Sequence, residues 1–74
     1  GSQREGGLMT GDSLLNAAYL HFKALKARAE ANLEVYLTGF AGVAEHPDVV
    51  KEVIELTKTI VEAEEAIKYL EQKL

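Results

Sequence analysis

Apolar side chains recur at intervals of three or four residues along two stretches of the chain. In the second stretch the steps of four and three continue without a slip, through Val49, Val53, Leu56, Ile60, Ala63, Ile67, Leu70 and Leu74. This repeat places its members on one face of a helix and is typical of a seam packed against a second helix. The pattern predicts a helix over about residues 47–74.

In the first stretch the larger side chains fall at heptad spacing, and its seam consists of Leu15, Ala18, Phe22, Leu25, Ala29, Asn32 and Tyr36. A strand does not fit, because neighbouring apolar pairs break a period of two. Neither proline nor glycine interrupts residues 13–38, which are rich in strong helix formers. We predict a helix there, with Asp12 or Ser13 as its N-cap. Asn32 could be buried in the seam or could lie at its rim.

The residues between the two predicted helices are those of a turn with helix caps. Gly39 is expected to follow the first helix with a positive φ, and Gly42 adds a second flexible position. His46 precedes a proline, which favours a non-helical N-cap conformation. Pro47 is suited to the first position of the second helix, and Asp48 places negative charge near the positive end of its dipole.

Two rods of similar length joined by a turn at residues 39–46 predict an antiparallel helical hairpin. Further apolar residues stand beside both seams: Val50, Ile54 and Val61 with Thr57 in the second helix, and Leu14, Leu33, Val35 and Leu37 in the first. A helix with one partner needs about two apolar residues in seven, whereas a helix in a bundle needs about three.

The expected fold is therefore all-α, an antiparallel two-helix hairpin that dimerises into a four-helix bundle with two-fold symmetry. A higher oligomer, or a bundle completed by another protein, would satisfy the same need. The candidate interface residues are Leu15, Phe22, Leu25, Tyr36, Val53, Leu56, Ile60, Ile67 and Leu70.

Charge supports the antiparallel pairing. The 74 residues contain 8 Lys and Arg against 12 Asp and Glu, which gives a net charge of −4. Three basic against two acidic residues give the first predicted helix +1, and four lysines against seven acidic residues give the second −3. With Thr38 opposite Pro47, His21 would lie level with Glu64.

The acidic balance argues against a dedicated nucleic-acid binder, which usually carries a basic excess. Lys23, Lys26 and Arg28 nevertheless form one local basic group in the first helix. The alternative function is therefore a nucleic-acid-associated module that uses this group. Its residues are also explained as a solvated face complementary to the acidic second helix.

Candidate catalytic and metal-binding residues are few. The sequence has no cysteine and two histidines, His21 and His46, and it lacks the Glu-x-x-His motif of di-iron bundles. The group around His46 has one nitrogen ligand, and helix capping explains it as well as zinc would. Ser13 stands in no nucleophile elbow. We expect a protein that is not an enzyme and that binds no metal or cofactor.

The amino end resembles the remnant of a cleaved tag. Residues 1–8 read GSQREGGL, and Met9 would then be the natural start. The remaining residues 9–74 are expected to form one domain. No secretory signal precedes them, and no apolar run approaches the roughly 18 residues of a membrane helix. A cytoplasmic protein without a membrane partner is the default expectation.

Two segments resemble small helical proteins of T4-like tailed bacteriophages. Residues 31–37 read ANLEVYL and residues 42–48 read GVAEHPD. In those phage proteins an Asn-Leu-x-x-Tyr-Leu helix end leads through a Gly-Val/Ile-Gly-Glu-His-Pro turn into an acidic helix. The resemblance covers about half of the chain and implies a phage context, in the host cytoplasm or the virion, without implying an activity. The function expected is that of a non-enzymatic, self-associating helical interaction protein. It would serve as a phage accessory or structural component, or as a binder of a host protein.

Overall fold

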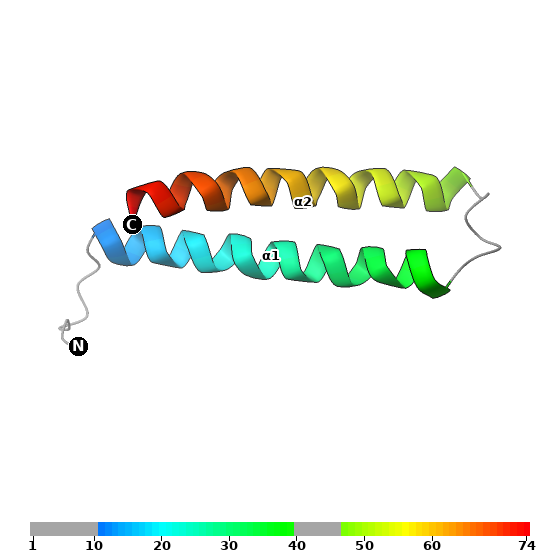
Figure 1. Ribbon diagram of the computed structural model, residues 1–74, viewed down its shortest axis with the longest axis horizontal. Coiled ribbons are helices and arrows are strands. Elements are labelled where there is room, and N and C mark those ends of the chain that lie inside the picture. The colour runs from blue at the N-terminus through cyan, green and yellow to red at the C-terminus, as the bar shows by residue number, and fades with distance from the viewer. Residues whose placement is uncertain (1–10, 40–46) are drawn as a thin grey trace.

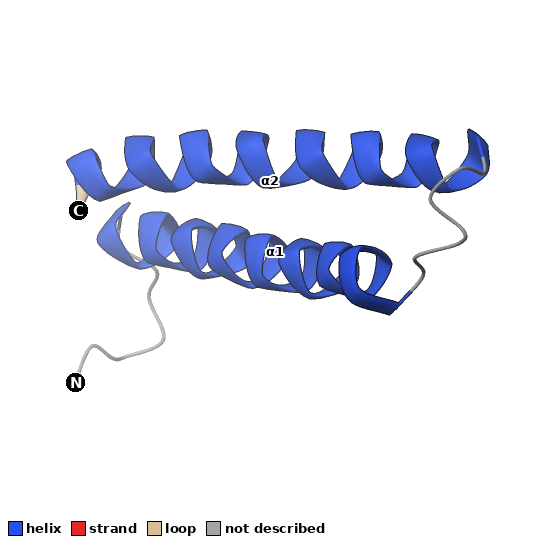
Figure 2. Cartoon of the chain, turned by 45° about the vertical axis from the view of Figure 1, so that its right-hand side comes forward, coloured by secondary structure: helices blue, strands red, loops and turns tan. Residues whose placement is uncertain are grey.

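The chain folds into two antiparallel helices that lie side by side (Figure 1). The computed structural model describes residues 11–39 and 47–74. Helix α1 comprises Gly11–Gly39 and helix α2 comprises Pro47–Lys73. The molecule is elongated, with extents of 54 × 19 × 15 Å, and a second view shows the same pairing of the helices (Figure 2). The predicted all-α helical hairpin is confirmed.

Helix α1 is longer at both ends than its pattern predicts. It begins at Gly11, so Asp12 and Ser13 lie inside its first turn and neither is the N-cap that we predicted. Asp12 still places a carboxylate near the positive end of the helix dipole. Gly39 is the last residue of α1, and its φ is not in the left-handed region. The predicted positive φ at Gly39 is therefore wrong, because the helical conformation continues through this residue.

Helix α2 begins at Pro47 as predicted, with Asp48 in its first turn. The predictions for Gly42 and His46 lie outside the described residues. At the other end the helix stops at Lys73, although the N–H of Leu74 still donates to the carbonyl oxygen of Leu70 at 3.0 Å. Leu74 is exposed and does not belong to the buried seam, since it lies beyond the last residue of α2.

The buried core occupies only part of the contact between the helices. Four described residues are buried, namely Ala29, Ala63, Ile67 and Leu70. Ala29 and Ala63 lie near the middle of the hairpin, and the two larger residues lie toward the carboxyl end of α2. Between this core and the Gly39 end of α1, the seam residues of both helices are only half-buried. The hairpin alone therefore leaves that part of its seam incompletely covered.

The seam of α1 shifts by one residue in its second half. Asn32 is exposed, whereas Leu33 is half-buried between Ala29 and Tyr36. The rim position is therefore the correct one for Asn32. An α-helix has 3.6 residues per turn, so a strict seven-residue repeat drifts by about 20° per heptad around a straight helix. After two to three heptads this drift turns the Asn32 position toward solvent and brings the Leu33 position toward α2.

The register of the two helices differs from the one expected. Glu64 lies beside Lys26 rather than His21, with 3.4 Å between Lys26 Nζ and Glu64 Oε2. The change corresponds to about 7 Å along the helix axis. The expected register assumed that Thr38 and Pro47 face each other directly. Packing of the seam side chains fixes the register instead, because a turn of this length tolerates such a displacement.

Candidate interaction surface

One side of the hairpin carries two polar contacts that join the helices, and we call it the paired flank. The Tyr19 hydroxyl donates to Glu71 Oε2 at 3.2 Å, and Lys26 Nζ pairs with Glu64 Oε2 at 3.4 Å. Residues seven apart lie on nearly the same side of a helix, because seven residues make almost two turns. The contact positions can therefore be followed along both helices in steps of seven.

Toward the Gly39 end of α1, the residues at these positions on the paired flank become apolar. Leu33 comes seven residues after Lys26, and Thr57 comes seven residues before Glu64. The steps of seven reach Leu33 of α1 and Val50 and Thr57 of α2, and Leu37, Ile54 and Val61 lie beside them, about 40–60° further round their helices. These six residues form the apolar half of the paired flank. All except Leu33 are exposed, with exposed fractions of 67% for Leu37, 47% for Val50, 52% for Ile54 and 51% for Val61.

Thr57 does not interrupt this apolar surface. Its hydroxyl donates to the carbonyl oxygen of Val53 in the preceding turn, at 2.7 Å. A threonine that bonds back to its own helix satisfies its hydroxyl without water. Its methyl group then adds to the surface formed by Val50, Ile54 and Val61. The apolar half is thus continuous over about three turns of α2.

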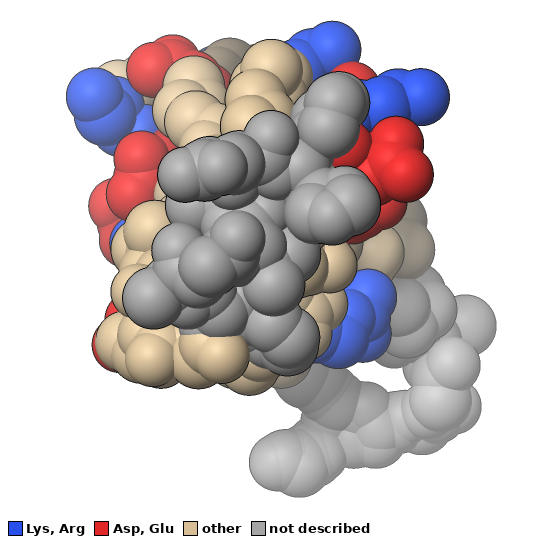
Figure 3. Space-filling view, turned by 90° about the vertical axis from the view of Figure 1, so that its right-hand side faces the viewer, with Lys and Arg blue, Asp and Glu red and all other residues tan. Residues whose placement is uncertain are grey.

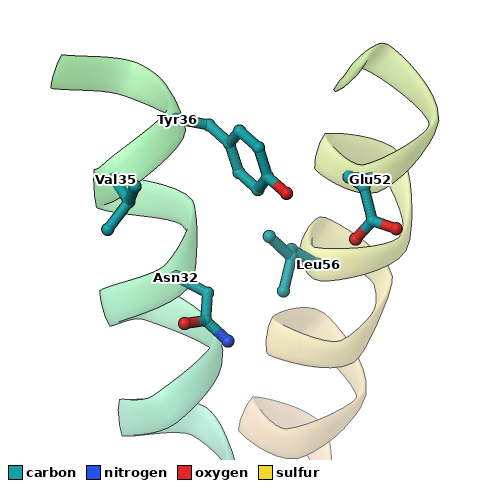
Figure 4. A pocket seen from close by; sticks show the side chains of 5 residues that line it. All are labelled: Asn32, Val35, Tyr36, Glu52 and Leu56. Atoms are coloured by element: carbon teal, nitrogen blue, oxygen red, sulfur yellow. The ribbon is translucent and has the colours of Figure 1, made fainter. Parts of the chain in front are cut away.

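The opposite side of the hairpin, which we call the groove flank, contains a hollow of about 370 Å³ (Figure 4). It is lined by Asn32, Val35 and Tyr36 of α1 and by Glu52 and Leu56 of α2. The side chains of Tyr36 and Leu56 reach toward each other from the two helices, and Glu52 lies beyond the Tyr36 ring (Figure 4). The lining brings together one carboxylate, one amide and one phenol.

The outer side of α1, which faces away from α2, carries small side chains. Viewed from the turn end, much of the charge lies around α2, whereas the surface below α1 is largely uncharged (Figure 3). A second series with steps of three and four runs along this outer side, through Ala17, Leu20, Ala24, Ala27 and Ala31. All five residues are exposed. The sequence contains this spacing, but sequence reasoning missed the series because it followed the larger side chains of the seam.

The three basic residues of the proposed nucleic-acid module do not form one patch. Lys23 Nζ lies 5.7 Å from the centre of the Tyr19 ring. Lys26 Nζ is shared between two carboxylates, at 3.4 Å from Glu64 Oε2 and 3.9 Å from Glu30 Oε2. These carboxylates reduce the positive potential that a phosphate would meet.

Arg28 is separated from the other two basic residues by its position around the helix. Five residues separate it from Lys23, which corresponds to about 140° around α1. The two side chains therefore leave the helix on different sides. A single phosphate backbone cannot contact both from one direction.

His21 is exposed, and its ring meets Phe22 edge-on with 5.0 Å between ring centres. The carboxylate that sequence reasoning placed opposite it, that of Glu64, pairs with Lys26. Across residues 11–39 and 47–74, no group of three or more His, Asp and Glu side chains is arranged to hold a metal ion. His46 and its neighbour Glu45 lie outside these ranges.

The nine candidate interface residues all lie on the seam between α1 and α2. Ile67 and Leu70 are buried inside the single hairpin. The other seven are half-buried, namely Leu15, Phe22, Leu25, Tyr36, Val53, Leu56 and Ile60. They are first of all the core of the hairpin. The exposed large apolar side chains include six that sequence reasoning had placed beside the seam, namely Leu14, Val35, Leu37, Val50, Ile54 and Val61, together with Leu20, Tyr69 and Leu74.

Sequence reasoning did not show which side of the hairpin Val50, Ile54 and Val61 share. That depends on the rotation of each helix about its own axis, and the contacts of Lys26 and Tyr19 with α2 reveal it. Neither described helix has an apolar stretch that would let it cross a membrane. Comparison of the chain with family models, with curated proteins and with solved structures gives no significant match.

Proposed function

We propose that this chain is a non-enzymatic helical interaction protein that works as a self-associated dimer. The observation that carries the proposal is the combination of a short buried core with an exposed apolar surface beside it. Two of the four buried residues are alanines, and where the apolar half of the paired flank lies the seam residues of both helices are only half-buried. A partner bound at this flank would cover the exposed apolar side chains and would also bury the half-buried part of the seam.

The free energy of burying the exposed apolar side chains shows why a second copy is a suitable partner. Full burial of a Val, Leu or Ile side chain contributes about 1.5–3 kcal/mol. Leu37, Val50, Ile54 and Val61 are each about half exposed or more, so covering each one contributes roughly 1–1.5 kcal/mol. Two copies together would gain roughly 8–12 kcal/mol, against an association cost of about 4–15 kcal/mol. The largest gain against the smallest cost leaves about 8 kcal/mol, so we expect a weak dimer, with a dissociation constant no tighter than about micromolar.

Small chains rarely obtain enough stability from a single hydrophobic core, and oligomerisation is a common remedy. The sequence contains no cysteine for a disulfide. Association would bury side chains of the paired flank and complete the seam between α1 and α2. In this proposal folding and association support each other.

The biological setting of the proposal comes from the resemblance of the segments at 31–37 and 42–48 to phage proteins. We propose a phage accessory or structural component, or a binder of a host protein, that acts in the host cytoplasm or in the virion. The exposed apolar and acidic surfaces are compatible with either role. The proposal assigns no substrate, metal or cofactor.

Sedimentation equilibrium of the whole chain tests the proposal. At tens of micromolar, we expect a mass of twice the 8.1 kDa of one chain. Ile54→Lys should return the mass to that of one chain, because it places a charge in the apolar half. Leu20→Lys is the matched control: Leu20 is similarly exposed but lies on the outer side of α1, so the dimer should persist. A wild-type mass of one chain at these concentrations would contradict the proposal.

A further inference from the structure

The paired flank differs in character between its two halves. Toward the Gly11 end of α1 it is polar, with the contacts of Tyr19 and Lys26 to the two glutamates of α2. Toward the Gly39 end it is apolar over about three turns of α2 and carries the exposed side chains of Ile54 and Val61. A surface with this asymmetry does not match a copy of itself equally well in every orientation.

We propose that the paired flank binds a second copy of this chain with a two-fold axis parallel to the helices, so that the Gly39 ends of both copies lie at the same end of the dimer. This inference rests on the proposed self-association and adds the contact surface and the orientation. Two hairpins that pack face to face have two symmetric choices. The axis runs either along the helices or across them, within the plane of contact.

The distribution of apolar residues favours the axis along the helices. In that arrangement the apolar half of one copy lies against the apolar half of the other, and the two polar halves also meet. With the axis across the helices and full overlap, Val50 and Ile54 would face the polar half of the partner. Apolar side chains would then remain beside charged ones, and Lys26 and Glu64 would lose water without gaining new partners.

Charge favours the same arrangement. With the axis along the helices, α1 of one copy lies beside α2 of the other. Helix α2 carries four lysines and seven acidic residues, for a net −3, whereas α1 has three basic and three acidic residues and is neutral. In the polar half, Lys23 of one copy comes to the level of Glu64 and Glu71 of the other, with Lys68 further round α2.

The axis across the helices would instead place α2 beside α2. Two helices that each carry a net charge of −3 would then lie side by side, which is unfavourable. Both orientations make every neighbouring pair of helices antiparallel, as in a regular four-helix bundle, so helix direction alone does not distinguish them. The distribution of apolar residues and the distribution of charge thus both favour the two-fold axis along the helices.

Distances between spin labels test this orientation, and the absence of cysteine from the sequence makes single-cysteine labelling selective. Lys51→Cys and Gln72→Cys place labels near the two ends of α2, at exposed positions about 31 Å apart along the axis. In the proposed dimer the label-to-label distance should be similar for the two variants. With the axis across the helices, at least one of the two distances should exceed about 30 Å, because equivalent ends then lie far apart.

The outcomes separate the failure of the orientation from that of self-association. Similar distances for Lys51→Cys and Gln72→Cys in a species of two-chain mass support the inference. A two-chain mass with one long distance overturns the orientation and leaves self-association standing. Loss of the dimer in Leu20→Lys, with retention in Ile54→Lys, overturns the contact surface and assigns it to the outer side of α1. A one-chain mass without an intermolecular distance overturns both.

Discussion

Lys26 and Glu64 form an ion pair between the helices, with 3.4 Å between Nζ and Oε2, at the border between the polar and apolar halves of the paired flank. The pair identifies the register of the hairpin and the side on which Val61 and Ile54 emerge. Both side chains are partly exposed, at 33% for Lys26 and 51% for Glu64. Its role in specifying register is therefore larger than its contribution to stability.

Glu64→Gln should lower the free energy of unfolding by less than about 1 kcal/mol, because solvent screens a partly exposed pair. The loss should shrink further in high salt. A double-mutant cycle isolates the coupling energy between Lys26 and Glu64. It compares the urea unfolding of the wild type, Lys26→Gln, Glu64→Gln and the double variant. Lys58→Gln is the control, since Lys58 pairs with Glu55 within α2 at 3.9 Å. A coupling energy of several kcal/mol would contradict this account of the pair.

Ile67→Ala should destabilise the hairpin strongly, because Ile67 is one of two large buried side chains in the described chain. Removing a buried isoleucine to alanine typically costs about 2–5 kcal/mol. Leu20→Ala, at an exposed position of α1, should change stability by no more than about 0.5 kcal/mol. Circular dichroism during thermal unfolding measures both. Equal losses for the two variants would show that the buried face is misassigned.

Leu33 and Asn32 should respond in opposite ways to alanine. Leu33→Ala removes a half-buried side chain of the seam and should cost about 1–2 kcal/mol. Asn32→Ala, at the exposed rim, should be neutral or stabilising by a few tenths of a kcal/mol, since alanine is the better helix former. Chemical denaturation at a fixed protein concentration compares the two. A larger loss of stability for Asn32→Ala than for Leu33→Ala would show that Asn32, and not Leu33, packs in the seam.

Gly39→Ala should be tolerated and should stabilise the protein by about 0.4–1 kcal/mol. Gly39 has a φ outside the left-handed region, and a methyl group at its Cα would meet no atom within 4 Å. Replacing glycine under these conditions lowers the entropy of the unfolded chain. The melting temperature should therefore rise. A clear fall in the melting temperature would indicate that Gly39 needs a conformation that alanine disfavours.

The helices and their pairing were predictable from the sequence, because Val53, Leu56, Ile60 and Ile67 keep an uninterrupted repeat that only a helix satisfies. The shift from Asn32 to Leu33 was not predictable from spacing alone. Steps of three then four and of four then three from Ala29 both reach Tyr36. The choice depends on the drift of a straight helix against a seven-residue repeat, which accumulates along the chain.

The candidate surface was predictable in composition but not in position. The sequence singles out Val50, Ile54 and Val61 as surplus apolar residues. It does not show that they share a flank with Lys26, since this depends on how far each helix is rotated toward the other. The register depends on packing in the same way, which explains why Glu64 meets Lys26 instead of His21.

If the hairpin completes its core by pairing with a second copy, its melting temperature depends on protein concentration. When folding and association are coupled, dilution destabilises the folded state by mass action. We expect the melting temperature of the whole chain to rise steadily from about one to several hundred micromolar, and Ile54→Lys to remove this dependence. A melting temperature of the wild-type chain that stays constant across that range would contradict this pairing.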